Sequence, residues 1–269
     1  MLVTWKIPEL FMNLIETEAV VLHASDYGES DRIVTFFTLA SGLVRALAKG
    51  ARRSRERFVH AFEPNSVVRL SFRQRRGLAW VESCRLVEGN LGLRSDPSRW
   101  AYAGLLVETT LRLHPENLPN TQFYALLCGA LARLGTERDP VNVAALFLVR
   151  GIHLVGGLPS LESCGQCGRK LGESSTWTLS LGAGRFACQA HGLNHAGAIT
   201  LDKGSAILLH AMLQGPVEKI WRFRLRKGMA SEIVRAAAAW VEEQSGQRLK
   251  SRRALNCVMD PRWAEECNP

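Results

Sequence analysis

The sequence lacks a hydrophobic run long enough to cross a membrane. Its most apolar stretch, Val141 to Leu158, is interrupted by Arg150 and His153 and falls short of a bilayer-spanning helix. The first twenty residues carry Glu9 and Glu16 and have no continuous apolar core, which argues against a signal peptide. We therefore expect a soluble, cytoplasmic protein whose 269 residues, 46% of them hydrophobic, bury a substantial core.

Acidic residues are scarce, so the formal net charge is +9. The excess is concentrated in two places. Between Arg45 and Arg76 there are ten Lys or Arg against two acids, and between Val217 and Arg253 there are ten against four. Two such cationic segments indicate a polyanionic partner, and nucleic acid is the natural one.

The spacing of a disulfide framework is also missing, because the cysteines number seven and are unevenly placed in a long chain. Four residues instead form two ligand pairs, CGQC and CQAH: Cys164, Cys167, Cys188 and His191. Two pairs brought together by the fold would bind one structural zinc ion in a closed tetrahedral site. His195 is an alternative fourth ligand, and a redox-active CxxC or simply buried thiols are the competing interpretations.

Residues 18 to 88 alternate with the period of two that is typical of half-buried strands. We predict five strands at Glu18–Ala24, Arg32–Leu39, Leu43–Lys49, Asn65–Arg73 and Leu78–Val87. Five short strands with a basic loop favour an OB-fold, a small barrel that binds oligonucleotides. The candidate phosphate contacts are cationic residues of this segment: Lys49, Arg52, Arg53, Arg55, Arg57, Arg73, Arg75 and Arg76. Phe72 and Trp80 are either core residues or base-stacking platforms.

Helical patterns follow Asn90. Asp96-Pro97 and Asp139-Pro140 each offer a carboxylate N-cap before a proline, and Gly135 ends the helix between them. On the first helix, Trp100, Val107 and Leu111 recur on one face. After a hairpin within 176–186, we predict helices at 203–213, 217–225 and 231–244. The expected fold class is therefore α+β, with an N-terminal five-stranded OB-fold barrel, an α-helical domain and a small zinc-binding insertion.

Four segments, taken in order, resemble the RecO family of recombination mediators in bacterial DNA repair. They are ETEAVVLHASDYGESDRIVTFFT (16–38), GLVRALAKGARR (42–53), GLPSLESCGQCGR (157–169) and LKSRRAL (249–255). The chain departs from the family pattern at His191, where a fourth cysteine is common, and at residues 1–12, so that Met12 is a candidate initiator.

The resemblance implies an OB-fold domain at 1–90, a helical domain at 91–160 and 201–269, and a zinc-binding segment at 161–200. It also implies a nucleoid-associated protein without enzymatic activity. Such a protein binds and anneals single-stranded DNA and binds double-stranded DNA. It works with RecR and RecF, contacts the C-terminal tail of single-strand binding protein, and helps load RecA.

Partner recognition calls for a basic rim around an apolar groove. The candidates on the helices are Arg112, Arg133 and Arg150, with Arg222, Arg224 and Arg226 as alternative rim or DNA contacts. Helix-face arginines are more commonly just solvated.

Two other functional classes fit parts of the sequence. An RNA-binding OB module with zinc has the same charge, and RNA–DNA competition would distinguish it. A zinc-dependent deaminase would use His114 and Glu116 with CGQC, but Ser163 stands where that signature has proline, and a fourth ligand would leave no site for water.

Overall fold

The computed structural model describes residues 14–54, 57–58, 60–75, 77–192 and 197–259. The proposed extension at 1–12 lies outside these residues, as do Arg55, Arg76 and His195. The chain forms two compact units. One comprises the residues up to Gly89 together with Pro115–Pro119, and the other comprises Asn90–His114 and the residues from Asn120 onward.

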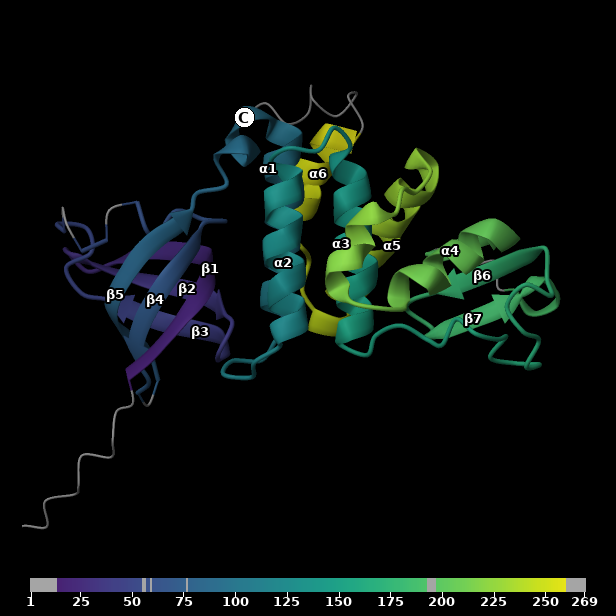
Figure 1. The fold of residues 1–269 in the computed structure, drawn as a ribbon, viewed down its shortest axis with the longest axis horizontal. Helices are drawn as coiled ribbons and strands as arrows, with labels where there is room; N and C mark the ends of the chain where they lie inside the picture. Colours follow the sequence, from purple (N-terminus) through teal and green to yellow (C-terminus); the bar gives the residue numbers. More distant parts are fainter. Residues whose placement is uncertain (1–13, 55–56, 59, 76, 193–196, 260–269) are drawn as a thin grey trace, which may run out of the picture. The chain divides into compact units, whose positions relative to one another are not determined.

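The first unit is built on five strands (Figure 1): β1 (Leu14–Tyr27), β2 (Asp31–Thr38), β3 (Gly42–Ala48), β4 (Val67–Arg73) and β5 (Ala79–Glu88). They close into a barrel in the order β1-β2-β3-β5-β4. Neighbouring strands are antiparallel except for β3 and β5, which pair in parallel at Ala46–Ala79 and Leu47–Trp80. The five predicted strands are confirmed, with β1 extending three to four residues further at each end.

The barrel interior is filled by the apolar residues of the alternating pattern. Val68, Leu70 and Phe72 are fully buried, as their spacing predicts. Phe58 and Phe62, from the segment between β3 and β4, belong to the same core cluster, and their ring centroids lie 5.0 Å apart. Because Phe72 is buried, it is a core residue and is not available to stack a base.

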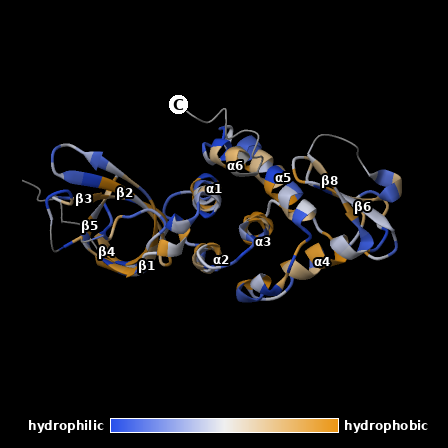
Figure 2. Ribbon diagram, turned by 90° about the horizontal axis from the view of Figure 1, so that it is seen from above, coloured by the Kyte–Doolittle hydropathy of each residue, from blue (hydrophilic) through white to orange (hydrophobic). Residues whose placement is uncertain are grey.

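The second unit begins with three helices, α1 (Pro97–Leu113), α2 (Thr121–Leu134) and α3 (Pro140–Leu154). The two predicted carboxylate caps are confirmed, because Asp96 accepts from the Ser98 N–H and Asp139 from the Asn142 N–H. Hydrophobic residues run along α3 (Figure 2), which is buried over nearly its whole length. Among the described residues, no helix combines the length and apolarity needed to cross a bilayer. The predicted face of α1 is wrong for Trp100, whose exposed fraction is 42%.

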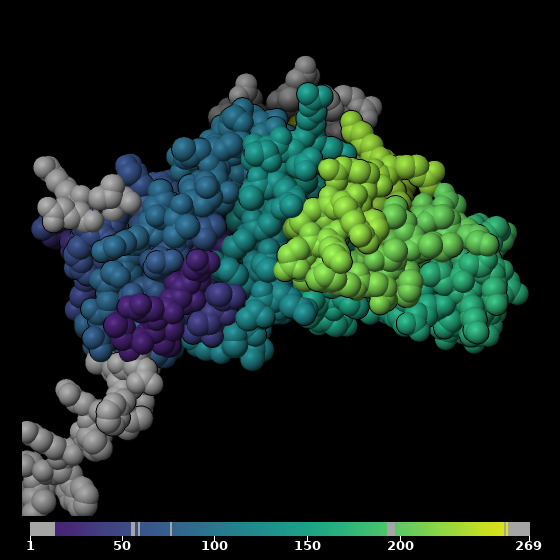
Figure 3. Space-filling model, in the orientation of Figure 1, coloured from purple at the N-terminus to yellow at the C-terminus, as the bar shows by residue number. Residues whose placement is uncertain are grey.

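A small sheet and further helices complete this unit. Strands β6 (Thr176–Ser180), β7 (Arg185–Cys188) and β8 (Ala198–Asp202) pair in the order β7-β6-β8, which confirms the hairpin and adds a strand that was not predicted. The remaining elements are α4 (Lys203–Leu213), the 3-10 helix η3 (Val217–Arg222), α5 (Lys227–Ser245) and α6 (Ser251–Met259). In Figure 3, the yellow-green residues that follow α4 cover part of the teal helices, in agreement with the packing of η3 on α2 and α3.

Candidate metal centre and cationic face

Four ligand atoms converge next to the β6–β7 hairpin. The sulfurs of Cys164, Cys167 and Cys188 and an imidazole nitrogen of His191 all lie within 4.8 Å of one another. Cys164 Sγ is 3.8 Å and Cys188 Sγ is 3.5 Å from His191 Nδ1, and Cys167 Sγ is 3.8 Å from Cys188 Sγ. The two predicted pairs therefore form a single cluster that could hold a metal ion.

These separations fit a tetrahedral ion. With Zn–S bonds of about 2.3 Å and Zn–N bonds of about 2.0–2.1 Å, tetrahedral geometry places two sulfurs roughly 3.8 Å apart and a sulfur and a nitrogen roughly 3.5 Å apart. The observed distances are close to both values. His191 supplies the fourth ligand in this cluster. With three thiols and one imidazole, the set leaves no coordination position for a reactive water.

Backbone geometry explains how the CGQC turn brings its thiols together. Gly168 has a φ of +71°, a left-handed conformation that favours glycine, and its N–H donates to the Cys164 carbonyl at 2.9 Å. Gly192 is needed for a different reason, because a Cβ there would lie 2.7 Å from the Thr178 hydroxyl oxygen. Both positions therefore favour glycine, Gly168 because of its backbone conformation and Gly192 because of its close approach to β6.

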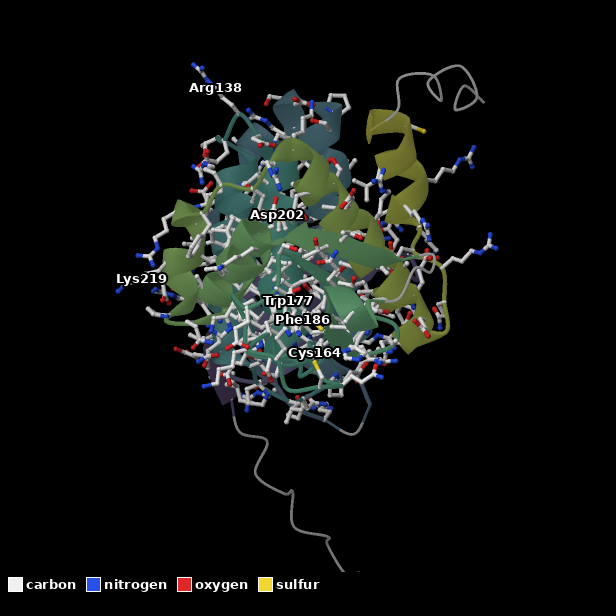
Figure 4. The ribbon with its side chains drawn as sticks, turned by 90° about the vertical axis from the view of Figure 1, so that its right-hand side faces the viewer. Arg138, Cys164, Trp177, Phe186, Asp202 and Lys219 are labelled. Carbon is white, nitrogen blue, oxygen red and sulfur yellow. The ribbon has the colours of Figure 1, made fainter. Side chains whose placement is uncertain are left out.

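The environment of Cys164 favours its thiolate. Burial alone would raise the pKa of this thiol, but N–H groups of Cys188, Cys167 and Gln166 donate to the sulfur and lower its pKa to about 6. Beside the cluster, the rings of Trp177 and Phe186 stack with centroids 4.6 Å apart (Figure 4). Both rings are buried, so the hairpin that presents Cys188 has an apolar support of its own.

The barrel carries its own distinctive group, a tryptophan with two cations over its ring. Trp80 lies on β5 between the buried residues Ala79 and Val81, so its ring projects outward and is only partly covered. Lys49 Nζ is 4.0 Å from the ring centroid and Arg75 Cζ is 3.5 Å from it. Neither cation lies within ion-pair distance of a described carboxylate, although Asp31 acts on Lys49 from further away, so both can pair with an external anion.

Other predicted phosphate contacts are already paired within the barrel unit. Arg52 lies 3.3 Å from Asp26 and Arg53 lies 3.7 Å from Glu29. Arg73 donates to Glu82 at 2.8 Å. Arg57 donates to the Glu82 carbonyl at 3.2 Å and lies over the ring of Phe58. These surface pairs are solvent-exposed and weak, so they compete with an external phosphate without excluding it.

Asp31 is a structural residue that the charge pattern alone does not reveal. Its carboxylate accepts the Gly50 N–H at 2.8 Å and the Ser30 hydroxyl at 2.9 Å, and these bonds lower the pKa of Asp31. The acidic side chain thereby fixes the start of the basic loop that follows β3. The sequence signal that could have identified this role of Asp31 is its position at a turn, where an aspartate side chain commonly bonds the backbone.

The three predicted partner-binding arginines are all engaged inside the second unit. Arg150 is not on an exposed rim: its exposed fraction is 6%, and its guanidinium donates to the carbonyls of Leu213 and Gly215. Arg112 bonds Gln247 and lies 3.5 Å from Glu108, while Arg133 lies over the ring of Trp221. Arg222, Arg224 and Arg226 are exposed, and the latter two pair with Glu137 and Asp202.

The deaminase interpretation is not favoured by the fold. His114 directly follows α1 and is buried with its ring 4.2 Å from that of Phe123. Glu116 forms a β-bridge with Leu43 in the barrel unit. Neither residue belongs to the cysteine-histidine cluster.

A cationic five-stranded barrel, followed by a helical unit with a Cys₃His cluster beside its small sheet, defines a class of α+β protein with features typical of nucleic-acid binding. Two models of known families match consecutive parts of this chain. Residues 12–90 match the family model "Recombination protein O N terminal" and residues 94–253 match "Recombination protein O C terminal". The chain belongs to the RecO family of DNA repair proteins, which gives it a role in DNA repair and recombination.

Individual relatives agree over nearly the full chain. The DNA repair protein RecO of Syntrophobacter fumaroxidans is 37% identical over 244 residues, covering 91% of this chain and 98% of the relative. The protein of the same name from Anaeromyxobacter dehalogenans strain 2CP-C is 32% identical over 249 residues, covering 91% and 97%. That of Symbiobacterium thermophilum is 30% identical over 259 residues, covering 93% and 100%.

Proposed function

We propose that this protein is a non-enzymatic recombination mediator that binds and anneals single-stranded DNA. Its barrel acts as an OB-fold, and its domains follow the extents 1–90, 91–160, 161–200 and 201–269. With RecR and RecF it helps load RecA onto strands coated with single-strand binding protein, whose acidic C-terminal tail it recognises. It acts in the cytoplasm at the nucleoid and also binds double-stranded DNA.

The observation that carries this proposal is the Lys49–Trp80–Arg75 group on the barrel. A single strand presents unstacked bases and a phosphate backbone, so the cations can turn to the phosphates and leave an indole face for a base to stack on. The cations neutralise phosphates without reading sequence, and two strands held on one cationic surface repel each other less. Annealing then follows from proximity, and no covalent bond is made or broken.

The test is the salt dependence of single-stranded DNA binding. In the double variant Lys49→Gln, Arg75→Gln, the slope of log affinity against log salt should fall by about 0.7 per lost phosphate contact, or roughly 1.4 in total. The matched control is Arg69→Gln, Arg85→Gln, which removes two exposed charges elsewhere on β4 and β5. If both double variants lose the same amount of slope, the protein attracts DNA only through its overall charge, and the proposed binding site at Lys49 and Arg75 is wrong.

Annealing of complementary strands precoated with single-strand binding protein tests the mediator role. We expect the wild-type protein to accelerate annealing without nucleotide and the Lys49, Arg75 double variant to lose most of that acceleration. Equal acceleration on strands coated with a tail-deleted single-strand binding protein would contradict tail recognition. Preference for RNA over DNA of the same sequence would instead support an RNA-binding module.

We also propose that the Cys₃His cluster binds one structural zinc ion. The support is the donor set and its near-tetrahedral spacing. When bound, zinc would cross-link the CGQC turn to the end of the β6–β7 hairpin. Cys188→Ser should abolish zinc binding, measured by elemental analysis, and lower the melting temperature, because metal binding and local folding are coupled. Cys128→Ser, outside the cluster, should retain about one equivalent; a metal-free wild-type protein would contradict the assignment.

A further inference from the structure

A surface pocket of about 270 Å³ lies where three helices of the second unit begin. Ser98 comes from the first turn of α1, Asp139 precedes α3, and Lys227 and Ser231 come from α5. Each helix N-terminus carries a partial positive charge from its aligned peptide dipoles. An end that no carboxylate caps favours an anion, and α5 has such an end at this pocket.

The three helix ends are not equally satisfied. Asp96 caps α1 and Asp139 caps α3, but α5 has no side-chain cap. Arg226, at the N-cap position, turns instead toward Asp202 at 2.5 Å and Ser205 at 3.0 Å. The N–H groups of Lys227, Gly228 and Met229 have no acceptor among the described residues, so the first turn of α5 retains free donors.

An independent observation is Tyr102, a residue that also lines the pocket. This residue is 4% exposed, and within the described part of the chain nothing hydrogen-bonds its hydroxyl. Its oxygen is not among the buried polar atoms that have no partner, so the hydroxyl reaches solvent at the pocket, and a ligand there can replace water as its hydrogen-bond partner. Burial first, and then the charge of Asp139, raise the pKa of Tyr102 to about 12, so the phenol stays protonated and can donate to an anion.

The charged side chains at the pocket have a positive balance. Arg138 and Lys227 are exposed and make no ion pair with any carboxylate that the structure describes, and Figure 4 shows Arg138 extending from this end of the unit. Asp139 is the opposing charge, and its carboxylate already accepts the Asn142 N–H at 3.2 Å. The Ser231 hydroxyl adds a further donor without a described partner.

We propose that this pocket binds a phosphate monoester group, with the Tyr102 hydroxyl, the Lys227 ammonium and the free N–H groups of α5 as its donors. A dianionic terminal phosphate matches several donors and two cations converging in a concave site. The pocket belongs entirely to the second unit, so the proposal does not depend on DNA binding by the barrel.

The test uses the full-length protein and inorganic phosphate at constant ionic strength, followed by calorimetry and by the melting temperature. Lys227→Gln should weaken phosphate binding by about tenfold, and Tyr102→Phe by roughly three- to tenfold. Because the hydroxyl has no described hydrogen bond, Tyr102→Phe should melt like the wild type without phosphate and gain less stability with it.

Lys219→Gln is the matched control, since it removes one exposed charge from η3, well away from Arg138 in Figure 4. It should bind phosphate like the wild type. The proposal is overturned if about 10 mM phosphate gives neither heat nor stabilisation, or if Lys219→Gln weakens binding as much as Lys227→Gln.

Two sources of the phosphate are distinguished with DNA and nucleotides. If oligonucleotides with a 5′-phosphate bind more tightly than those with a 5′-hydroxyl, and Tyr102→Phe removes the difference, the ligand is a DNA end. If a nucleoside monophosphate competes with inorganic phosphate while oligonucleotide ends make no difference, the ligand is a soluble nucleotide. Either result supports the pocket.

Discussion

The proposed role of Trp80 predicts how a single residue on the barrel would affect the binding of single-stranded and double-stranded DNA. Trp80→Leu should cost about 1–3 kcal/mol in binding single-stranded DNA, because one stacking surface is lost. Duplex binding should change little, since paired bases are not available to stack. Fluorescence anisotropy with both substrates at one salt concentration measures the difference. Trp100→Leu, at the 42% exposed tryptophan of α1, is the control, and a comparable loss there would remove the argument for Trp80.

The same scale shows what a sequence can reveal about individual side chains. The members of the Cys₃His cluster are predictable because the spacing within each pair is local, and alternation correctly assigns Leu70 to the core. The environment of Arg150 is not predictable, because its acceptors Leu213 and Gly215 lie more than sixty residues away. Phe72 and Trp80 are both aromatic strand residues, and only the register of the barrel separates the buried ring from the partly exposed one.

Among the elements, α6 is held in place by a carboxylate from α1. Glu108 accepts the N–H groups of Lys250 and Ser251 at 3.0 and 2.9 Å and the Ser251 hydroxyl at 2.9 Å. Burial raises the pKa of Glu108, but these bonds and Arg112 outweigh it and lower the pKa overall. Glu108 therefore stabilises the fold above its unfolded pKa of about 4.3, and this contribution is lost as the pH falls through the lower folded pKa.

Glu108→Gln should reduce the free energy of unfolding at neutral pH by about 1–2 kcal/mol, because a neutral amide accepts these bonds less strongly. Urea unfolding at pH 7 and below pH 4 measures the free energy of unfolding of both proteins. The difference between Glu108→Gln and the wild type should be smaller at the acidic pH. The control is Glu232→Gln on the exposed face of α5. A difference between Glu108→Gln and wild type that is the same at both pH values would show that charge at this position is unimportant.

The sequence predicts an element correctly where its periodic hydrophobic pattern extends over many residues and ends at a clear boundary residue. The five barrel strands and α3 have such patterns, whereas β8 and α6 are short and were missed. The start of α5 was placed four residues late because Gly228 interrupts the apolar pattern. The segment predicted as a helix at 217–225 is a 3-10 helix that ends at Arg222.

At the scale of the whole molecule, sequence order and compact units do not coincide. The stretch Pro115–Pro119, between α1 and α2, belongs to the barrel unit. There the Asn117 N–H donates to the Leu43 carbonyl at 2.9 Å. Gly42, with a φ of +66°, has no room for a side chain because a Cβ would collide with the Leu118 carbonyl oxygen.

Gly42→Ala should therefore destabilise the barrel more than Gly50→Ala does. Both positions have a left-handed backbone, which costs a non-glycine residue about 1–2 kcal/mol, but a Cβ at Gly50 meets open space. The collision with Leu118 should add roughly 1–3 kcal/mol. Urea unfolding monitored by circular dichroism compares the two variants. Equal losses of unfolding free energy in the two variants would indicate that residues 115–119 move away from the new Cβ with no loss of stability.

The path of the chain through Pro115–Pro119 limits how this protein can be recombined with others. A graft that takes only the residues before Asn90 leaves behind the piece that covers Gly42. A chimera that keeps this contact exchanges two separate gene segments together, because the barrel unit is discontinuous in the sequence.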